Sequence, residues 1–189
     1  MRGPRATVAC MSLIADLQLR LDQAIAAGVT PGAVLVVTTS DATLASIVAG
    51  QTTYGGAAVT VDTRYDAASL TKVAVTLPSI LRLIDLGEIG LDDPVGRFYG
   101  AAGWFRRPSL ADVTIRSLLA HASGLAAWRP LYAEAADRSR ALAFLLNEPV
   151  AEAPTATYSD LGFMLLGAIV ERVAGERLDL FAAREVFAP

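Results

Sequence analysis

The apolar positions in the first part of the chain change from a helical spacing to a strand pattern. Apolar side chains recur on one face of a predicted helix at Leu13, Leu17, Leu21 and Ile25. Gly28 followed by Pro31 predicts the end of that helix. The apolar run over residues 33–37 predicts a buried strand, residues 40–41 a turn, and residues 44–48 its hairpin partner. This part of the chain therefore predicts one helix followed by a β-hairpin.

The apolar period becomes helical again at Ser69 and stays helical to the end of the chain. The first apolar stripe ends at Gly87 and consists of Val73, Leu77, Ile80, Leu81 and Ile84. Pro78 lies inside this stripe and predicts a kink, because proline has no backbone N–H to donate. Residues 91–94 predict a turn, and further helices are predicted over residues 115–120, 131–147, 159–174 and 178–187. The order of helix, two strands and helices indicates a mixed α/β (α+β) protein.

Composition removes several classes of function. The chain has 189 residues, of which 53% are hydrophobic and 19% charged, so it is not a disordered segment. Its net charge of -3 provides no basic surface for nucleic acid, and no apolar run reaches the 18 or so residues of a membrane span. The single cysteine, Cys10, and the single histidine, His121, exclude an internal disulfide and a His-paired zinc site. We therefore expect no metal and no cofactor.

The N-terminus allows two interpretations. Two arginines precede an apolar run over residues 6–15, which is the arrangement of a short signal peptide. No small-residue cleavage site follows, and the run continues into the predicted helix. We therefore expect a cytoplasmic protein, with export as the alternative. Translation could also start at Met11, which would make residues 1–10 an N-terminal extension.

The basic residues point to one position. Fifteen of the sixteen are arginine, and the only lysine is Lys72. Arginine replaces lysine on a solvated surface but not where an amine must lose its proton. Ser69 lies three residues earlier, at the start of a predicted helix, so the two side chains share one helix face. A neutral amine there can activate the hydroxyl as a nucleophile; the alternative is a capping serine beside an exposed lysine.

A second group of polar residues, Tyr158, Ser159 and Asp160, stands at the start of another predicted helix. Tyr158 can relay a proton to a leaving group if nearby cations lower its pKa. In a second register Ser159 and Asp160 begin an S-D-N motif with Ser159 as proton shuttle, but Leu161 stands where that motif needs Asn. We therefore favour Tyr158.

Four segments in this order resemble one family. They are residues 66–72 (Asp-Ala-Ala-Ser-Leu-Thr-Lys), 91–94 (Leu-Asp-Asp-Pro), 114–125 with His-Ala-Ser-Gly-Leu, and 158–167 with Tyr-Ser-Asp. The chain resembles the beta-lactamase-related serine hydrolases, which include class C beta-lactamases, D-Ala-D-Ala carboxypeptidases and family VIII esterases. The resemblance runs from about residue 11 to the end and covers the N-terminal part of such a protein.

The resemblance implies roles for individual residues. Ser69 is the acylated nucleophile, Lys72 its activating partner and Tyr158 the general base and acid. Asp160 contacts Lys72 and substrate; it replaces the Asn of class C enzymes, which favours the esterase and carboxypeptidase branch. The Ser69 N–H is one oxyanion donor, and the second comes from a K-T-G or H-x-G strand that this chain lacks.

Other residues near these motifs have less certain roles. The resemblance implies that His121 orders a loop behind the site. A triad through Ser123 would need a G-x-S-x-G elbow, in which His121 occupies the first Gly position. Trp128, which we assign to substrate binding, and Tyr132 either rim the cleft or pack in the core.

The expected fold is an incomplete beta-lactamase/transpeptidase-like domain. Residues 11–56 form the N-terminal helix and hairpin of the sheet domain, and residues 57–189 form the helical domain. Two strands are not a stable sheet by themselves, so we expect the C-terminal strands to be missing after Pro189. The expected function is acyl transfer from an ester, amide or β-lactam to water through a Ser69 acyl-enzyme, weak or absent in this chain alone. The alternative is a non-catalytic half that binds ligand or a complementing C-terminal chain.

Overall fold

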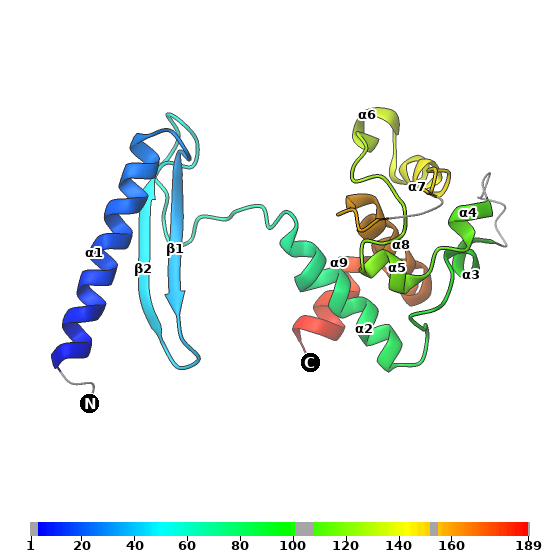
Figure 1. The fold of residues 1–189 in the computed structure, drawn as a ribbon, viewed down its shortest axis with the longest axis horizontal. Helices are drawn as coiled ribbons and strands as arrows, with labels where there is room; N and C mark the ends of the chain where they lie inside the picture. Colours follow the sequence, from blue (N-terminus) through cyan, green and yellow to red (C-terminus); the bar gives the residue numbers. More distant parts are fainter. Residues whose placement is uncertain (1–3, 101–107, 152–154, 189) are drawn as a thin grey trace. The chain divides into compact units, whose positions relative to one another are not determined.

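The computed structural model describes residues 4–100, 108–151 and 155–188, and it divides into two compact units (Figure 1). The first unit comprises residues 1–66 and the second residues 67–189. The predicted boundary after residue 56 lies in the loop that ends the first unit. Among the described residues, no helix combines the length and the apolar character that a bilayer span requires.

The first unit is a long helix beside a β-hairpin (Figure 1). Helix α1 (Pro4–Ala26) packs against strand β2 (Thr43–Gly50), which pairs antiparallel with β1 (Gly32–Thr38). Gly28, with a φ of 71°, follows the helix in the left-handed conformation that favours glycine. The predicted helix and hairpin are therefore confirmed. The helix includes residues 4–10, which the sequence assigned to an extension.

Burial of the hairpin is uneven. Ala45 and Ile47 on β2 are 5% and 3% exposed. Val36 on β1, which pairs with Ser46, is 52% exposed. The prediction that residues 33–37 form a buried strand is therefore wrong. The strand pattern was correct, but Val36 and its partner Ser46 lie on the face opposite to Ala45 and Ile47, and this face is exposed in the described residues.

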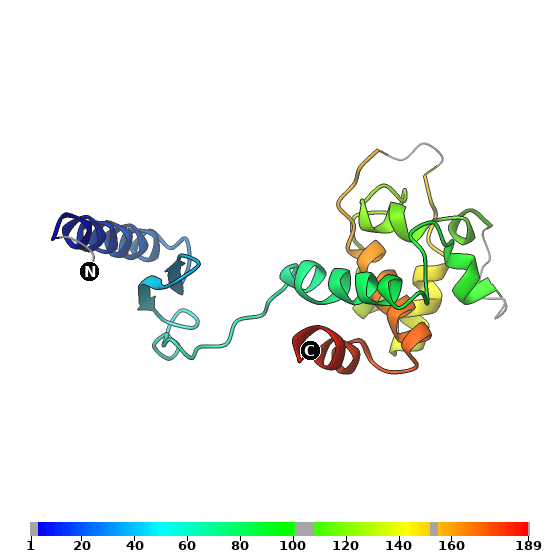
Figure 2. The same cartoon turned by 90° about the horizontal axis from the view of Figure 1, so that it is seen from below.

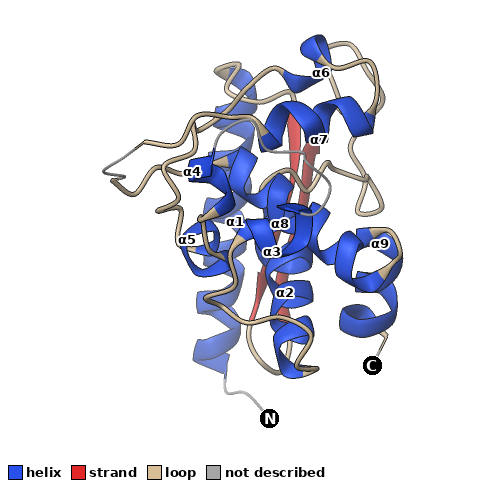
Figure 3. Ribbon diagram, turned by 90° about the vertical axis from the view of Figure 1, so that its right-hand side faces the viewer, coloured by secondary structure: helices blue, strands red, loops and turns tan. Residues whose placement is uncertain are grey.

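Helices joined by loops make up the described part of the second unit, with one isolated β-bridge between Pro94 and Thr114 (Figure 3). Its helical segments are η1 (Lys72–Thr76), α2 (Leu77–Asp85), α3 (Val95–Tyr99), α4 (Pro108–Ala111), α5 (Ile115–Leu119), α6 (Leu131–Glu134), α7 (Arg138–Leu146), α8 (Asp160–Ala174), α9 (Leu178–Ala182) and η3 (Ala183–Phe187). Helix α8 contacts η1, α2, α3, α5, α7 and α9. Its inward side chains are fully buried at Leu161, Leu165, Leu166, Ile169 and Val170. The core of this unit is therefore organised around α8.

The predicted kink near Pro78 appears as a change of helix type. Segment η1 is a π-helical turn in which the N–H of Leu77 bonds to the carbonyl of Lys72. Helix α2 follows, with Pro78 in its first turn, where a proline needs no hydrogen-bonded N–H. Helix α2 runs beside α9 and η3 (Figure 2). Because the wider turn rotates the helix, Ile80 is buried as predicted whereas Val73 is 59% exposed.

The predicted helix over residues 131–147 is two helices, α6 and α7. Ala135 has an extended backbone, and the Asp137 side chain accepts the N–H of Arg140 as the N-cap of α7. This capping signal was present in the sequence but was outweighed by the apolar spacing. The predicted helix over residues 159–174 is confirmed as α8, whose N-cap is Ser159. Helices α3 and α4 are too short to show a helical period.

Candidate active site

Ser69 and Lys72 lie together at the start of the helical segment that leads into η1. The Lys72 Nζ donates a hydrogen bond to the Ser69 Oγ over 3.1 Å. The backbone N–H of Lys72 also donates to the Ser69 carbonyl, at 3.1 Å. Ala68, directly before Ser69, has a φ of 44°, a left-handed conformation that is unfavourable for alanine. The chain therefore presents the Ser69 hydroxyl to Lys72 from a strained turn.

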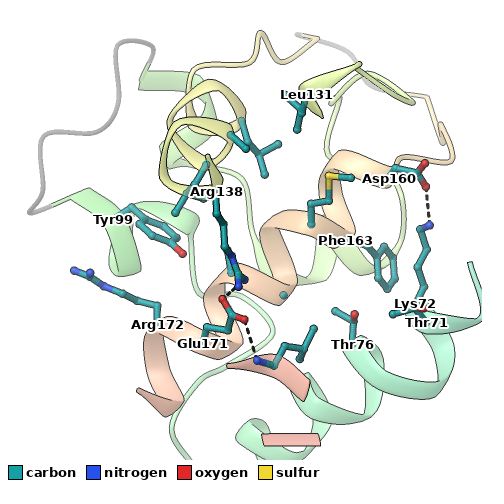
Figure 4. A pocket seen from close by; sticks show the side chains of 17 residues that line it. Thr71, Lys72, Thr76, Tyr99, Leu131, Arg138, Asp160, Phe163, Glu171 and Arg172 are labelled. Atoms are coloured by element: carbon teal, nitrogen blue, oxygen red, sulfur yellow. Dashed lines mark hydrogen bonds and ion pairs between the residues drawn. The ribbon is translucent and has the colours of Figure 1, made fainter. Parts of the chain in front are cut away.

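Asp160 forms an ion pair with Lys72. The Lys72 Nζ lies 2.6 Å from the Asp160 Oδ1, and the two side chains are 13% and 35% exposed. Asp160 is held at the first position of α8, where its N–H donates to the Ala127 carbonyl at 2.8 Å. Figure 4 shows the carboxylate and the ammonium pointing toward each other. The pair joins residues 88 positions apart, which sequence spacing does not reveal.

The charge of Lys72 differs from the sequence-based expectation. Burial lowers its pKa, but hydrogen bonds to Asp160 and Tyr158, together with their charges, outweigh burial and raise the pKa above its ordinary value. The structure therefore favours the ammonium form. The expectation of a neutral amine rested on Lys72 being the only lysine and on its spacing from Ser69, and the contact with Asp160 overrides it.

Tyr158 lies on the same ammonium group. The Lys72 Nζ is 5.0 Å from the centroid of the Tyr158 ring. Hydrogen bonding with Ser69 and then with Lys72 lowers the pKa of the Tyr158 hydroxyl below its usual range. The Tyr158 residue as a whole is 55% exposed. Among Ser69, Lys72 and Tyr158, Tyr158 is therefore the candidate base, because its lowered pKa favours the phenolate, which can accept a proton.

His121 supports this arrangement from behind. Its Nδ1 accepts the backbone N–H of Ser159 at 3.0 Å. Its ring centroid lies 4.5 Å from that of Tyr158 and 5.1 Å from that of Phe163. Phe163 is also 6.0 Å from the Lys72 Nζ. The sequence analysis did not assign Phe163, although its position one turn after Ser159 in α8 was a usable signal.

The two alternative serines are buried. Ser123 is 5% exposed, and its Oγ accepts the N–H of Leu125 at 3.4 Å. Ser159 is 1% exposed; its Oγ donates to the Ala126 carbonyl and accepts the N–H of Gly162. Both hydroxyls therefore serve local structure, which disfavours a triad through Ser123 and a proton shuttle through Ser159.

Trp128 and Tyr132 are exposed. Their exposed fractions are 55% and 82%, and their ring centroids are 6.4 Å apart. The alternative that they pack in the core is therefore wrong. Trp128 directly follows Ala127, whose carbonyl binds the N–H of Asp160. Binding of substrate by Trp128 stays a prediction.

A cavity of about 600 Å³ adjoins the Lys72–Asp160 pair. Aliphatic and aromatic side chains of α7 and α8 line much of it, and an Arg138–Glu171 ion pair lies at some distance from Lys72 (Figure 4). Burial raises the pKa of Tyr99, at the same end, to about 12. No local sequence signal pointed to this cavity. In the described part of the chain, no three His, Cys, Asp or Glu side chains come together as metal ligands.

Comparison with known proteins places these features in a family. The family described as Beta-lactamase matches residues 20–189. Esterase EstB of Burkholderia gladioli is 36% identical over 138 residues, which are 62% of this chain and 34% of the esterase. The N-acetylmuramyl-L-alanine amidase of Bacillus subtilis (strain 168) is 29% identical over 192 residues, covering 89% of this chain and 43% of the amidase.

Solved structures show the same relationship. A class C beta-lactamase from Rhodobacter sphaeroides superimposes with a TM-score of 0.69 at 25% identity, covering 89% of this chain and 47% of that one. SurE superimposes with a TM-score of 0.73 at 25% identity, covering 97% of this chain and 40% of SurE. The chain therefore spans less than half the length of the relatives it matches.

Proposed function

The chain belongs to the beta-lactamase family, and on this premise we propose that it carries the nucleophile of a serine hydrolase. The proposed reaction is acyl transfer from a small ester, amide or β-lactam to water through an ester on Ser69. The observation that carries the proposal is that the Lys72 ammonium group contacts all the other proposed catalytic side chains. Lys72 bonds to Ser69 and Asp160 and lies against Tyr158.

In the proposed acylation, deprotonated Tyr158 takes the proton of the Ser69 hydroxyl as the Oγ bonds to the substrate carbonyl carbon. The carbonyl electrons move to oxygen, and the Ser69 N–H donates one hydrogen bond to this oxyanion. When the carbonyl re-forms, the bond to the leaving group breaks and Tyr158 returns the proton to it. Lys72 stays charged, orients the Oγ and favours the phenolate of Tyr158.

Deacylation repeats these steps with water. Water gives a proton to Tyr158 and bonds to the acyl carbon, and Ser69 then leaves and takes that proton. Asp160 is proposed to hold Lys72 in place and to meet the substrate with its partly exposed carboxylate. Trp128 is proposed as an exposed apolar wall for the substrate.

We also propose a partner: a C-terminal chain of the same family that supplies the second oxyanion donor and further strands. The exposed Val36 on the hairpin supports this proposal, as does the share of the relatives that the chain spans. Loss of one oxyanion donor costs about 10²–10³ in turnover. We therefore expect weak activity from the 189-residue chain and a gain when the partner is added.

The direct test is hydrolysis of p-nitrophenyl acetate by the chain with and without such a partner. Ser69→Ala is expected to remove the enzyme-dependent rate in both samples, whereas Ser46→Ala on the exposed side of β2 serves as the matched control. Unchanged hydrolysis by the Ser69→Ala variant would contradict the proposal.

A cytoplasmic location is proposed as well. It is supported by helix α1 (Pro4–Ala26), because the apolar run over residues 6–15 is the first part of a longer helix that continues to Ala26. Cell fractionation tests it, and recovery of a shortened protein outside the cytoplasm would contradict it.

A further inference from the structure

His121 binds the backbone on both sides of Tyr158. Its carbonyl accepts the N–H of Thr157 at 2.8 Å, and its Nδ1 accepts the N–H of Ser159 at 3.0 Å. Its ring meanwhile lies 4.5 Å from the ring of Tyr158, centroid to centroid. One residue thus fixes the backbone before and after Tyr158 and one face of its side chain.

We propose that His121 is a positioning residue that acts only as a neutral imidazole, with Nδ1 as the acceptor and the proton on Nε2. In this state it holds the Tyr158 hydroxyl at Ser69 and Lys72. Protonation of His121 releases Tyr158 and sets an acid limit on the reaction. This inference rests on the proposed function, because it assigns Tyr158 the role of base.

The hydrogen-bond chemistry requires the neutral form. A backbone N–H is always a donor, so the Nδ1 that faces Ser159 must present a lone pair. A proton on Nδ1 would place two donors against each other and leave the Ser159 N–H without its acceptor in a part-buried position. The tautomer is thus fixed by this one contact.

The charged groups around the ring favour the same form. The pKa of His121 is lowered first by burial and then by the positive charge of Lys72, while the Asp160 carboxylate raises it to a smaller extent. The other neighbours of the ring are the Tyr158 phenol and the apolar Phe163. His121 therefore stays neutral, with Nδ1 as an acceptor, down to a lower pH than an ordinary histidine does.

The backbone of His121 gives independent support. Its φ is 55°, in the left-handed region that is unfavourable for non-glycine residues. Such a conformation persists where the surrounding contacts over-determine it, and it is concentrated at functional sites. Here the contacts that hold it are those to Thr157 and Ser159, together with the hydrogen bond from the His121 N–H to the Leu118 carbonyl at 3.1 Å.

The sharpest test uses the fact that His121 is the only histidine of the chain. Its imidazole signals in ¹⁵N NMR spectra therefore need no assignment. We expect the Nε2–H tautomer near neutral pH and a pKa below 6.5. The amide signal of Ser159 is expected to move with the same midpoint. An Nδ1–H tautomer, or a Ser159 amide signal that does not shift as His121 titrates, would overturn the inference.

Two variants then test whether the hydrogen bond between His121 and Ser159 affects the acylation of Ser69. His121→Asn keeps a side-chain acceptor and tolerates a left-handed backbone, whereas His121→Ala removes the acceptor. With a fluorophosphonate probe, we expect the Ala variant to label Ser69 about tenfold more slowly or worse. The Asn variant is expected to recover much of the rate and to lose the step of the pH profile at the His121 midpoint, while the rise due to the Tyr158 phenolate stays.

A step at the His121 midpoint that stays in the pH profile of His121→Asn, or an Ala variant that labels at the parent rate, would also overturn the inference. Failure of the proposed function has a different signature. In that case Ser69 takes no label in any variant, while the NMR titration still reports the tautomer and the Ser159 contact.

Discussion

The two units of the chain differ in how completely they bury their apolar residues. In the helical unit, five side chains of α8 are fully buried, and α8 contacts six other helical segments. In the first unit, the buried hydrophobic side chains of the described residues are Ala45, Ile47 and Val59, while Val36 is 52% exposed. The unit with the dense core is also the one that holds Ser69, Lys72, Tyr158 and Asp160.

This difference explains how short polar segments can form a precise site. Asp160 begins a helix whose following turns are fixed in the core, so its carboxylate has a defined place beside Lys72. The hydroxyl of Ser159 caps the same helix. The hairpin provides no comparable support, and none of the proposed site residues comes from it.

The largest expected effect is the loss of Ser69 acylation in Lys72→Arg, because all the proposed site residues lie in the helical unit. Lys72→Arg keeps the positive charge, but a planar guanidinium does not fit the positions from which the Nζ reaches both Ser69 and Asp160. We expect acylation of Ser69 to fall by about 10²–10⁴-fold. Arg20→Lys in α1, whose side chain is 71% exposed, is the matched control and should change nothing. Near-normal labelling of Lys72→Arg would break the assignment.

Truncations compare the two cores directly. Leu166→Ala removes a fully buried side chain from α8 and should lower the free energy of unfolding of the helical unit by about 2–5 kcal/mol. Val36→Ala, at an exposed position of β1, should cost well under about 1 kcal/mol. Urea unfolding followed by circular dichroism measures both. Equal losses would show that the hairpin is as well packed as the helical unit.

The pH dependence tests the electrostatics of the site. Because Ser69 and Lys72 stabilise the phenolate, the pKa of Tyr158 lies below the ordinary tyrosine value of 10.0. Labelling of Ser69 should therefore rise with pH, with a midpoint below 10. Tyr158→Phe should abolish this rise, whereas Tyr54→Phe in the first unit should preserve it. A midpoint at or above 10 in the parent protein would contradict the proposed base.

The smallest expected effects have opposite signs in the two units. Ala68→Gly relieves a left-handed backbone, with a φ of 44°, and should stabilise the helical unit by up to about 1 kcal/mol. Ala24→Gly inside α1 should instead destabilise the first unit by about 0.5–1 kcal/mol. Thermal unfolding of both variants gives the signs. Destabilisation by Ala68→Gly would show that the turn before Ser69 is not strained.

The elements were predictable where apolar residues repeat over several turns. This holds for α1, the hairpin and α8, whose periods are long and whose ends carry glycine or a capping serine. Local signals failed where a single side chain interrupts the pattern. Asp137 divides one predicted helix into two, and Val73 of the predicted apolar stripe is exposed in the π-turn before Pro78.

The site was predictable as a set of residues but not as an electrostatic arrangement. The spacing of Ser69 and Lys72 and the Tyr158–Asp160 segment was sufficient to select them. The charge of Lys72 depends on a carboxylate 88 positions away, and that contact exists only after folding. The place of Phe163 under the Lys72 ammonium depends on the same long-range packing.

The central claim is that Ser69 is the nucleophile, and covalent labelling tests it most directly. The chain is treated with a fluorophosphonate probe, alone and with a C-terminal chain of a family relative, and the adduct is mapped by peptide mass spectrometry. We expect one labelled serine, Ser69, and more label when the partner is present. Label on the buried Ser123 or Ser159, or no label on Ser69 in either sample, would contradict it.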